Sequence, residues 1–531
     1  MNFKIMLHVF IVVALFLHTR QMFAQNANAR PNIIYIMSDD HAYQAISAYG
    51  YGLNQTPNID KLADQGVLFN KAFVTNSICG PSRAVMLTGK HSHINGFKDN
   101  HSTFDGSQQT VTKLLHDGGY TTAVVGKWHL ISDPQGFDYW NILPGQGEYY
   151  NPDFVENGVR KKVPGYVTNL TTDFAMNWLD NRDKSKPFFL IYQQKAPHRN
   201  WMPEPKYYHM FDSTKFPLPG NFFDNYDTRT SAVREQEMEI ATHMHDFYDL
   251  KLAYDLPKEQ QKGLGNNWQN IFNRMTPEEK KEWEKAYGPS NEAFFKANLT
   301  GKELAVWKYQ RYLQDYLRCV QSVDDNVGRL MEYLKANGLD KNTIIIYTSD
   351  QGFYLGEHGW FDKRWMYEES FRTPLIVKWP GVTNKKIVSN SMVQNLDFAE
   401  TILDMAGLPI PKDMQGKSFA PVLKGKQKGD VRDALYYHFY ENQEHKVAKH
   451  IGVRTDRYKL IYFYEKKEWE LYDLQKDKSE MHNVYNDASY SKIREMMTKK
   501  LQKMKEEYKD TEPAELNAPF EMKTKNSKKS A

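Results

Sequence analysis

Nearly continuous apolar runs recur along the chain, and polar residues follow most of them directly. The first run covers residues 31–37 and leads into Ser-Asp-Asp-His. A strand that is buried on both faces of a parallel sheet has this continuous pattern, whereas a strand with one exposed face alternates between apolar and polar residues. The sequence therefore predicts buried strands at residues 31–37, 122–125, 188–192, 343–347 and 375–377.

Segments with apolar residues at helical spacing lie between these runs. Residues 58–65, 111–116 and 309–334 have this spacing, and a glycine follows soon after each of them, as is common beyond a helix C-terminus. The third segment contains Cys319, for which we expect a buried thiol. Strands that alternate with helices predict an α/β fold with a large, mostly parallel sheet flanked by helices.

Two further regions extend this α/β core, which we place at residues 30–425. Residues 205–301 are polar and aromatic-rich, with their clearest helical stretches at 235–252 and 277–287, and they predict a helical insertion over one edge of the sheet. A polar linker at 424–430 separates the core from a smaller α+β subdomain at about 430–510. Its predicted elements are strands at 434–440, 450–453, 458–464 and 469–474 and a helix at 491–508.

The two ends of the chain and its composition restrict the compartment and the partners. Lys4 and the apolar stretch 5–17 predict a signal peptide at 1–24, with cleavage as late as residue 29, because the stretch is too short to span a bilayer. The basic tail at 511–531 is expected to be disordered. A net charge of +4 over 531 residues does not indicate a nucleic-acid-binding surface, and two cysteines are too few for a disulfide framework. We expect a periplasmic or secreted protein without a membrane span.

Acidic residues stand directly after two of the predicted strands. Asp39 and Asp40 follow the first run, and Asp350 and Gln351 follow the run at 343–347. Because ligands bind beyond the carboxyl ends of parallel strands, these side chains are candidates for one site. Taken alone, each pair is also compatible with a turn or a helix cap. Together they offer only oxygen ligands, which suit Ca²⁺ or Mg²⁺ better than zinc.

Basic residues follow the other strands and their adjoining loops. They are Lys127 and His129 after the second run, His198 after the third, and Lys363 after Asp350. Each of them alone is more readily explained as a solvated surface charge. Their joint placement after predicted strands favours one cationic site. We regard His243 and His245 in the insertion as structural, since metal ligands need converging partners.

The chemistry centres on residues 77–89, which read Ser-Ile-Cys-Gly-Pro-Ser-Arg-Ala-Val-Met-Leu-Thr-Gly. Cys79 alone is compatible with a small buried thiol. The order Cys-x-Pro-Ser-Arg with a Leu-Thr-Gly ending, however, resembles the signature of type I sulfatases in the alkaline phosphatase superfamily. The resemblance runs from residue 31 to about 418 and continues more weakly at 469–473. It makes residues 30–425 the catalytic domain.

The resemblance implies a function for each candidate residue. A formylglycine-generating enzyme would convert Cys79 to formylglycine, whose hydrated aldehyde is the nucleophile. Asp39, Asp40, Asp350, Gln351 and the modified Cys79 would bind one Ca²⁺. Arg83, Lys127 and Lys363 would stabilise the sulfuryl group, His129 would act on the formylglycine hydroxyl, and His198 would assist the leaving alcohol. The chain departs from the family at Gln351, where Asn is commoner, and at Ile131, which replaces a glycine.

The implied substrate is a sulfated polysaccharide or its oligosaccharides. Residues 234–252 and 352–363 resemble bacterial glucosamine-6-sulfatases and mucin-desulfating sulfatases, and related sequences act on algal polysaccharides such as ulvan. One alternative is a phosphatase or phosphodiesterase of the same superfamily, although these use two zinc ions and several histidine ligands. A second alternative is a non-catalytic glycan-binding relative, which the intact Cys79 and Arg83 disfavour.

Overall fold

The computed structural model describes residues 30–441, 444–514 and 516. The predicted signal peptide at 1–24 and most of the predicted tail at 511–531 lie outside the described residues. Within them, no helix is both long and apolar enough to cross a membrane.

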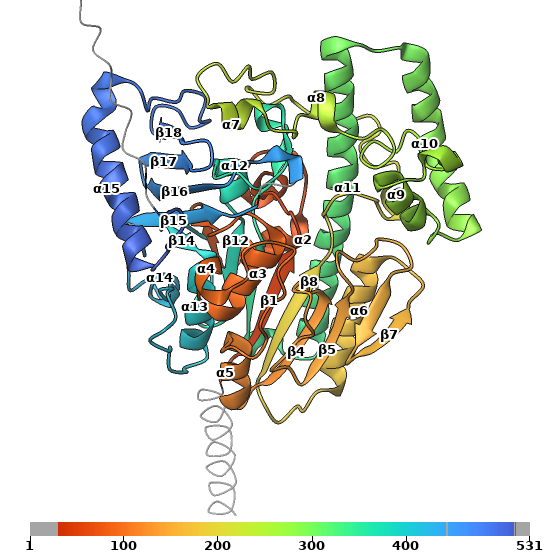
Figure 1. Cartoon of the computed structure of the whole chain (residues 1–531). Helices are drawn as coiled ribbons and strands as arrows, with labels where there is room; N and C mark the ends of the chain where they lie inside the picture. Colours follow the sequence, from red (N-terminus) through yellow and green to blue (C-terminus); the bar gives the residue numbers. More distant parts are fainter. Residues whose placement is uncertain (1–29, 442–443, 515, 517–531) are drawn as a thin grey trace, which may run out of the picture.

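A ten-stranded sheet forms the centre of the molecule, in the order β13-β2-β12-β9-β1-β8-β4-β5-β6-β7 (Figure 1). Its middle is parallel, as predicted: β9, β1, β8, β4 and β5 all run in one direction. These central strands are β1 (Asn32–Ser38), β4 (Thr121–Lys127), β5 (Tyr139–Leu143), β8 (Phe188–Gln194) and β9 (Thr343–Ser349).

The run at 375–377 forms β12 (Leu375–Lys378), which pairs antiparallel with β9, so the expectation of a parallel strand is wrong here. A strand covered on both faces is apolar whatever its direction, so its sequence does not distinguish the two. The outer strands carry weaker patterns; all four residues of β7 are exposed. They are β2 (Val67–Phe69), β6 (Asp153–Glu156), β7 (Val159–Lys162) and β13 (Ile387–Ser389).

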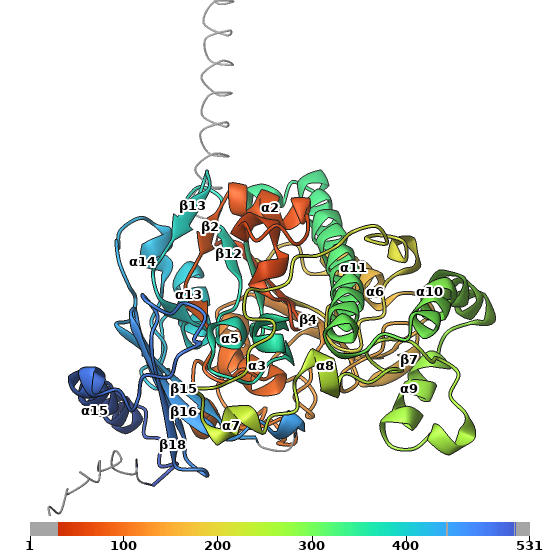
Figure 2. The ribbon, with the colours of Figure 1, turned by 90° about the horizontal axis from the view of Figure 1, so that it is seen from above.

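Helices cover both faces of the sheet (Figure 2). Alternate residues of β1 enter two different hydrophobic clusters, Ile34 and Ile36 on one face and Ile33, Tyr35 and Met37 on the other. The first face carries α2 (Pro57–Asp64), α6 (Val167–Asn181) and α11 (Gly301–Ala336). The second face carries α3 (Cys79–Thr88), α4 (Ser92–Asn95), α5 (Val111–Asp117) and α13 (Phe398–Met405).

The insertion is less helical than predicted. The expected helix at 235–252 is wrong, because only α8 (Ile240–His243) is helical there, after the short α7 (Ser231–Arg234). Asp249 accepts a hydrogen bond from the His245 backbone N–H and pairs with Arg199, so tertiary contacts fix this backbone in turns. The remaining helices are α9 (Leu264–Phe272) and α10 (Pro277–Ala297). In α11, Cys319 is fully buried, as expected.

The C-terminal region forms a separate antiparallel sheet of four strands, as its sequence predicts. One face packs against the helix α15 (Ser491–Glu507), and the other packs on aromatic residues of the larger domain such as Trp360 and Trp365. The strands are β15 (Ala434–Phe439), β16 (His450–Thr455), β17 (Tyr458–Phe463) and β18 (Glu468–Asp473). This sheet therefore lies beside the large domain as a smaller unit.

Candidate active site

Cys79 is the first residue of α3 and lies at the carboxyl edge of the central sheet. It is 1% exposed. Its Sγ lies 3.1 Å from Lys363 Nζ and 4.0 Å from Asp40 Oδ1. Burial raises the pKa of the Cys79 thiol well above its usual value, and the charge of Asp39 adds to this shift. The unmodified thiol is therefore neutral and is a poor nucleophile, because reactivity belongs to the thiolate.

The three aspartates converge beside Cys79. Carboxylate oxygens of Asp39, Asp40 and Asp350 all lie within 4.8 Å of one another, although the residues follow two different strands, β1 and β9. Neighbouring side chains of a strand normally point to opposite faces. The backbone of Asp40 departs from the strand conformation with a positive φ of 63°, so its side chain does not follow this alternation. The Tyr316 hydroxyl of α11 donates a hydrogen bond to the Asp40 carbonyl oxygen at 2.7 Å.

The donor set fits a hard divalent cation. Asp39 Oδ1, Asp40 Oδ2 and Gln351 Oε1 are buried and have no hydrogen-bond partner. Leaving such polar atoms unsatisfied in a dry interior is costly unless a ligand completes them. The Gln351 amide nitrogen donates to Asp40 Oδ1, so the side chain belongs to this cluster. Oxygen donors from three carboxylates and one amide match Ca²⁺ chemistry.

Three buried cations neutralise the acids. Arg83 donates from Nη2 to Asp350 Oδ2 at 2.9 Å, and its Nη1 donates to the Lys127 carbonyl at 2.7 Å. Lys127 Nζ pairs with Asp39, and Lys363 Nζ lies 2.5 Å from Asp40 Oδ1. None of the three cations is more than 3% exposed. The cluster is therefore a fixed arrangement of charges in a region that excludes water.

The pKa values of the acids differ because their partners differ. Burial alone would raise the pKa of Asp39, but the charges of Lys127 and Arg83 lower it well below its usual value. Burial raises the pKa of Asp40 to about 7 even though Lys363 opposes the shift. Burial also raises the pKa of Asp350, and the Asp39 charge adds to this. A divalent cation beside these carboxylates would favour their charged forms.

Two histidines border the cluster. His198 Nδ1 lies 2.5 Å from the Arg199 carbonyl oxygen and must carry the proton, because that oxygen can only accept. Its Nε2 then points toward Asp40, 3.7 Å from Oδ2. His129 has a positive φ of 56°, and its buried Nδ1 has no hydrogen-bond partner. Burial, with the charge of Lys127, lowers the pKa of both histidines well below the usual value, so both are neutral.

The structure thus brings together the residues singled out in the sequence. Direct contacts join the cysteine, the three aspartates, the glutamine, Arg83, the two lysines and His198. His129 lies within electrostatic reach of Lys127 and Asp39. Their arrangement is a matter of geometry, and the role of each residue stays a prediction.

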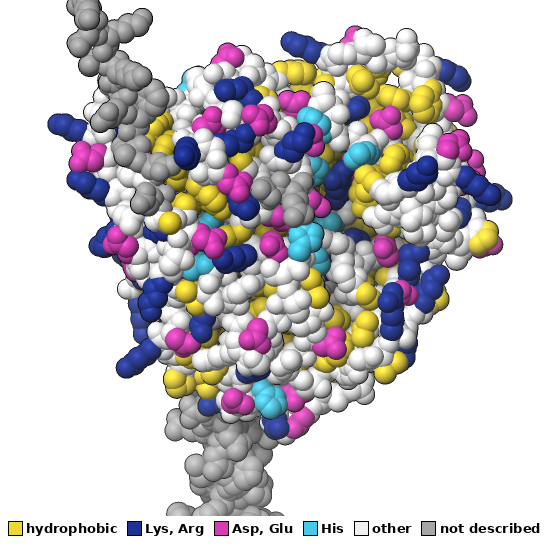
Figure 3. Space-filling model, in the orientation of Figure 1, with side chains coloured by type: hydrophobic (Ala, Val, Ile, Leu, Met, Phe, Trp, Pro, Cys, Tyr) yellow, Lys and Arg dark blue, Asp and Glu magenta, His cyan; other side chains and the backbone are white. Residues whose placement is uncertain are grey.

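Sequence reasoning missed a second polar group next to Lys363. Asp362 Oδ2 lies 2.8 Å from His445 Nε2, and Arg364 pairs with both Asp362 and Glu444. Arg199 Nη1 approaches His445 Nε2 at 3.3 Å. In Figure 3, histidine side chains gather near the centre of the face that lies between the C-terminal sheet and α11. The sequence offered one indication of this group, because Asp362 and Arg364 flank Lys363. It offered no indication of His445, which comes from a distant loop.

Comparisons with known proteins agree with this geometry. The profile of the family described as "Sulfatase" matches residues 31–408, and that described as "N-sulphoglucosamine sulphohydrolase, C-terminal" matches residues 356–507. The chain belongs to the sulfatase family. This sulfatase is 50% identical over 493 residues to an N-acetylglucosamine-6-O-sulfatase of Bacteroides thetaiotaomicron, with coverage of 92% of this chain and 88% of that protein.

A solved structure and a more distant relative extend this comparison. The solved structure of BT4656 in complex with its substrate D-glucosamine-2-N,6-O-disulfate superposes with a TM-score of 0.88 at 50% identity, covering 92% of this chain and 99% of that one. The human N-acetylglucosamine-6-sulfatase is 26% identical over 423 residues, which is 75% of this chain and 65% of the human protein. The predicted family and fold are therefore confirmed, and this sulfatase is a sulfuric ester hydrolase.

Proposed function

We propose that this sulfatase removes the 6-O-sulfate from glucosamine-type residues of a sulfated glycan and that it is an exported enzyme. The observation that carries the proposal is the position of Cys79, which faces a buried oxygen cluster and touches Lys363. Both relatives at 50% identity support the substrate class, one by its name and one by its bound disulfated glucosamine.

Two groups would complete the site. One Ca²⁺ would be held by Asp39, Asp40, Asp350 and Gln351, where it would draw negative charge away from a sulfate oxygen. Formylglycine at residue 79 would supply a hydrated aldehyde as the nucleophile, and Cys79 Sγ marks where its oxygens would lie. A neutral, buried thiol cannot supply that chemistry itself, which supports modification of this residue.

The fixed cations perform the electrostatic part of the reaction. Arg83, Lys127 and Lys363 surround the carboxylates, and their partners hold them in place before substrate arrives. Charge on a sulfuryl group in transfer spreads over its oxygens, so preorganised cations stabilise the transition state more than the bound ester. Lys363 lies closest to residue 79 and is therefore expected to contact the transferring group.

His198 is placed to handle the proton of the leaving alcohol. Its Nδ1–H is fixed on the Arg199 carbonyl, so Nε2 is the free nitrogen. Burial and the charge of Lys127 lower the pKa of this ring and keep it neutral. A bound sulfate ester adds negative charge, which raises the pKa of a neighbouring imidazole and lets it carry the proton that the alkoxide needs. His129, in the connection that follows β4, is proposed to accept the proton from the residue-79 hydroxyl.

The shape of the site favours a sulfate on a primary carbon. Cys79 is 1% exposed, so the sulfate must reach inward while the sugar ring stays outside. A 6-O-sulfate projects from the ring by one more bond than a ring sulfate does. Asp362, Arg364 and His445 then lie beside Lys363 and offer acceptors and donors for the ring hydroxyl groups. We propose that this group selects the sugar.

The proposal is tested with protein co-expressed with a formylglycine-generating enzyme. Turnover should be measured on N-acetylglucosamine-6-sulfate, on glucosamine-2-N,6-O-disulfate, on an ulvan oligosaccharide and on a phosphate monoester. We expect 6-O-desulfation of the two glucosamine substrates. Preference for the phosphate monoester would support the phosphatase alternative, and preference for the ulvan fragment would overturn the sugar assignment. N-terminal sequencing of the exported protein, expected to start between residues 25 and 30 of the printed sequence, tests export.

A further inference from the structure

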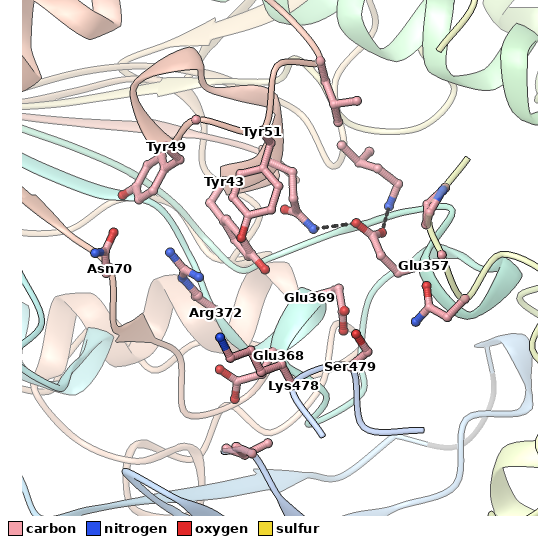
Figure 4. A pocket seen from close by; sticks show the side chains of 18 of the residues that line it. Tyr43, Tyr49, Tyr51, Asn70, Glu357, Glu368, Glu369, Arg372, Lys478 and Ser479 are labelled. Atoms are coloured by element: carbon pink, nitrogen blue, oxygen red, sulfur yellow. Dashed lines mark hydrogen bonds between the residues drawn. The ribbon is translucent and has the colours of Figure 1, made fainter. Parts of the chain in front are cut away.

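A second cavity lies apart from Cys79. It has a volume of about 1030 Å³, and no residue of the catalytic cluster lines it (Figure 4). Its walls come from η1 (Tyr43–Ala45) and the following loop, the insertion, the turn between β10 (Tyr354–Leu355) and β11 (Phe361–Asp362), and the C-terminal sheet region. The loop after η1 leads into α2, which covers the opposite face of the sheet from α3 (Figure 2). The size is at the upper end for ligand pockets.

Polar groups that line this cavity lack partners. Glu369 is 8% exposed and Gln44 is 2% exposed, and Glu369 Oε2 and Gln44 Oε1 have no hydrogen-bond partner. Arg372 Nε also has none. Two nearby cations, Arg454 and Lys459, pair with Glu368. Buried polar groups without partners are rare in folded proteins, and an ordered water, an ion or a ligand can satisfy them.

Some charges in the cavity are paired, Arg454 with Glu368 and Lys71 with Asp456, whereas Arg372 and Glu369 lie on different sides of it. Figure 4 shows Arg372 and Lys478 toward one side and Glu357 and Glu369 toward the other. Arg372 is held by stacking, with its guanidinium 4.0 Å from the Tyr43 ring centre. Burial and the Glu357 charge raise the pKa of Glu369 well above its usual value, so its carboxyl can donate as well as accept. The described cavity residues offer no trio of ligand atoms close enough for a metal ion.

The rim of the cavity is partly apolar. Tyr51 is 49% exposed and Leu218 is 37% exposed, and both line the opening. An exposed aromatic ring can stack on the C–H face of a sugar, while carboxyl and amide groups bind its hydroxyls. Arg372 and Lys478 suit an anionic substituent, because guanidinium and ammonium groups bind sulfate and carboxylate strongly. These features together match an anionic oligosaccharide better than a small metabolite or a metal.

We propose that this cavity is a secondary binding site for a short segment of a sulfated oligosaccharide. Hydroxyl groups would bond with Gln44 and Glu369, a sulfate or carboxylate would contact Arg372, and one ring would stack on Tyr51. The identity of the glycan rests on the proposed function, whereas the existence of the site rests on the cavity itself. Such a site would hold a polymer on the enzyme while a different residue of it enters the active site.

The test measures binding without turnover. Full-length Cys79→Ala protein is titrated calorimetrically with a heparin-derived hexasaccharide, in the presence of excess N-acetylglucosamine-6-sulfate to fill the active site. We expect one remaining binding event. Tyr51→Ala and Arg372→Gln, each added to this background, should weaken it about tenfold or more, the order expected for a lost stacking or charged contact. Phe295→Ala, which removes a ring that is 64% exposed on α10, is the matched control and should not change it.

The possible results distinguish failure of the secondary site from failure of the proposed function. No binding event beyond the filled active site, or equal affinity in the two cavity variants and the control, would overturn the secondary site. Tyr51 is exposed, so its variant should fold even if Arg372→Gln does not. If Arg372→Gln no longer weakens binding when the hexasaccharide is desulfated, this would support a contact between Arg372 and a sulfate group. Failure of wild-type turnover on sulfate esters would leave this binding result standing and would refute only the proposed function.

Discussion

Replacement of Lys363 by methionine removes the ammonium group nearest residue 79 and keeps most of the side-chain volume. Lys363 is 3% exposed, and its Nζ touches both Asp40 Oδ1 and Cys79 Sγ. A unit charge about 4 Å from a sulfuryl oxygen, in surroundings with an effective dielectric constant of about 20, contributes on the order of 4 kcal/mol. Loss of one preorganised donor correspondingly lowers turnover about 10²–10³-fold. We expect a fall of that size in kcat for Lys363→Met.

The assay compares kcat and KM on N-acetylglucosamine-6-sulfate, with Lys459→Met as the matched control. Lys459 is also fully buried and also pairs with carboxylates, at 2.9 Å to Glu368 and 2.7 Å to Glu480, but it belongs to the C-terminal sheet. Removing either lysine leaves a buried acid unpaired, so both variants should lose stability. Only Lys363→Met should lose kcat. An unchanged kcat with a raised KM, or an equal loss in Lys459→Met, would refute the catalytic role.

Three further predictions follow from the same structure. Chelation of divalent metal should abolish turnover and lower Tm. Added Ca²⁺ should restore both at about one ion per chain, because one oxygen-lined site implies that number. Restoration by zinc alone would contradict this prediction. In active protein, the peptide that carries Cys79 should be about 18 Da lighter than the peptide with an unmodified thiol, which is the change from thiol to aldehyde. Cys79→Ala should be inactive. Full activity with an intact thiol would exclude formylglycine. Burial raises the pKa of Glu400 from 4.5 to about 8, so the folded protein holds a proton that the unfolded chain releases, and stability should fall as pH rises from about 4.5 to about 8. Glu400→Gln should flatten this fall in a Tm series, and an unchanged slope would show that the carboxyl is not responsible.

Much of the large sheet could be predicted because its central strands are buried on both faces. Every residue of β1, β8 and β9 is buried, so each appears as an uninterrupted apolar run. Adjacent parallel strands end at one edge, and this places Asp39, Asp350 and the residues after β4 and β8 together. Strand β7, with all four residues exposed, gave no pattern and was missed.

Contacts between distant parts of the chain account for most of what the sequence did not show. The turns around residue 249 depend on Arg199, which belongs to another element, so local helical periodicity was misleading there. The contact of His445 with Asp362 likewise depends on how the C-terminal sheet docks. The unpaired groups around Glu369 become visible only when burial and hydrogen bonding are known. A linear pattern carries no information on any of these.

The burial of Cys79 at the start of α3 also constrains the order of events in the cell. An enzyme that converted this side chain to formylglycine, as proposed, would need access to it, yet the finished fold leaves the residue 1% exposed and covers all ten residues of its helix. If Cys79 is converted to formylglycine as proposed, this maturation would precede folding, during or soon after synthesis. A chain that folded before modification would then keep its thiol, so the proposed modification makes the yield of active enzyme depend on the rate of modification relative to the rate of folding.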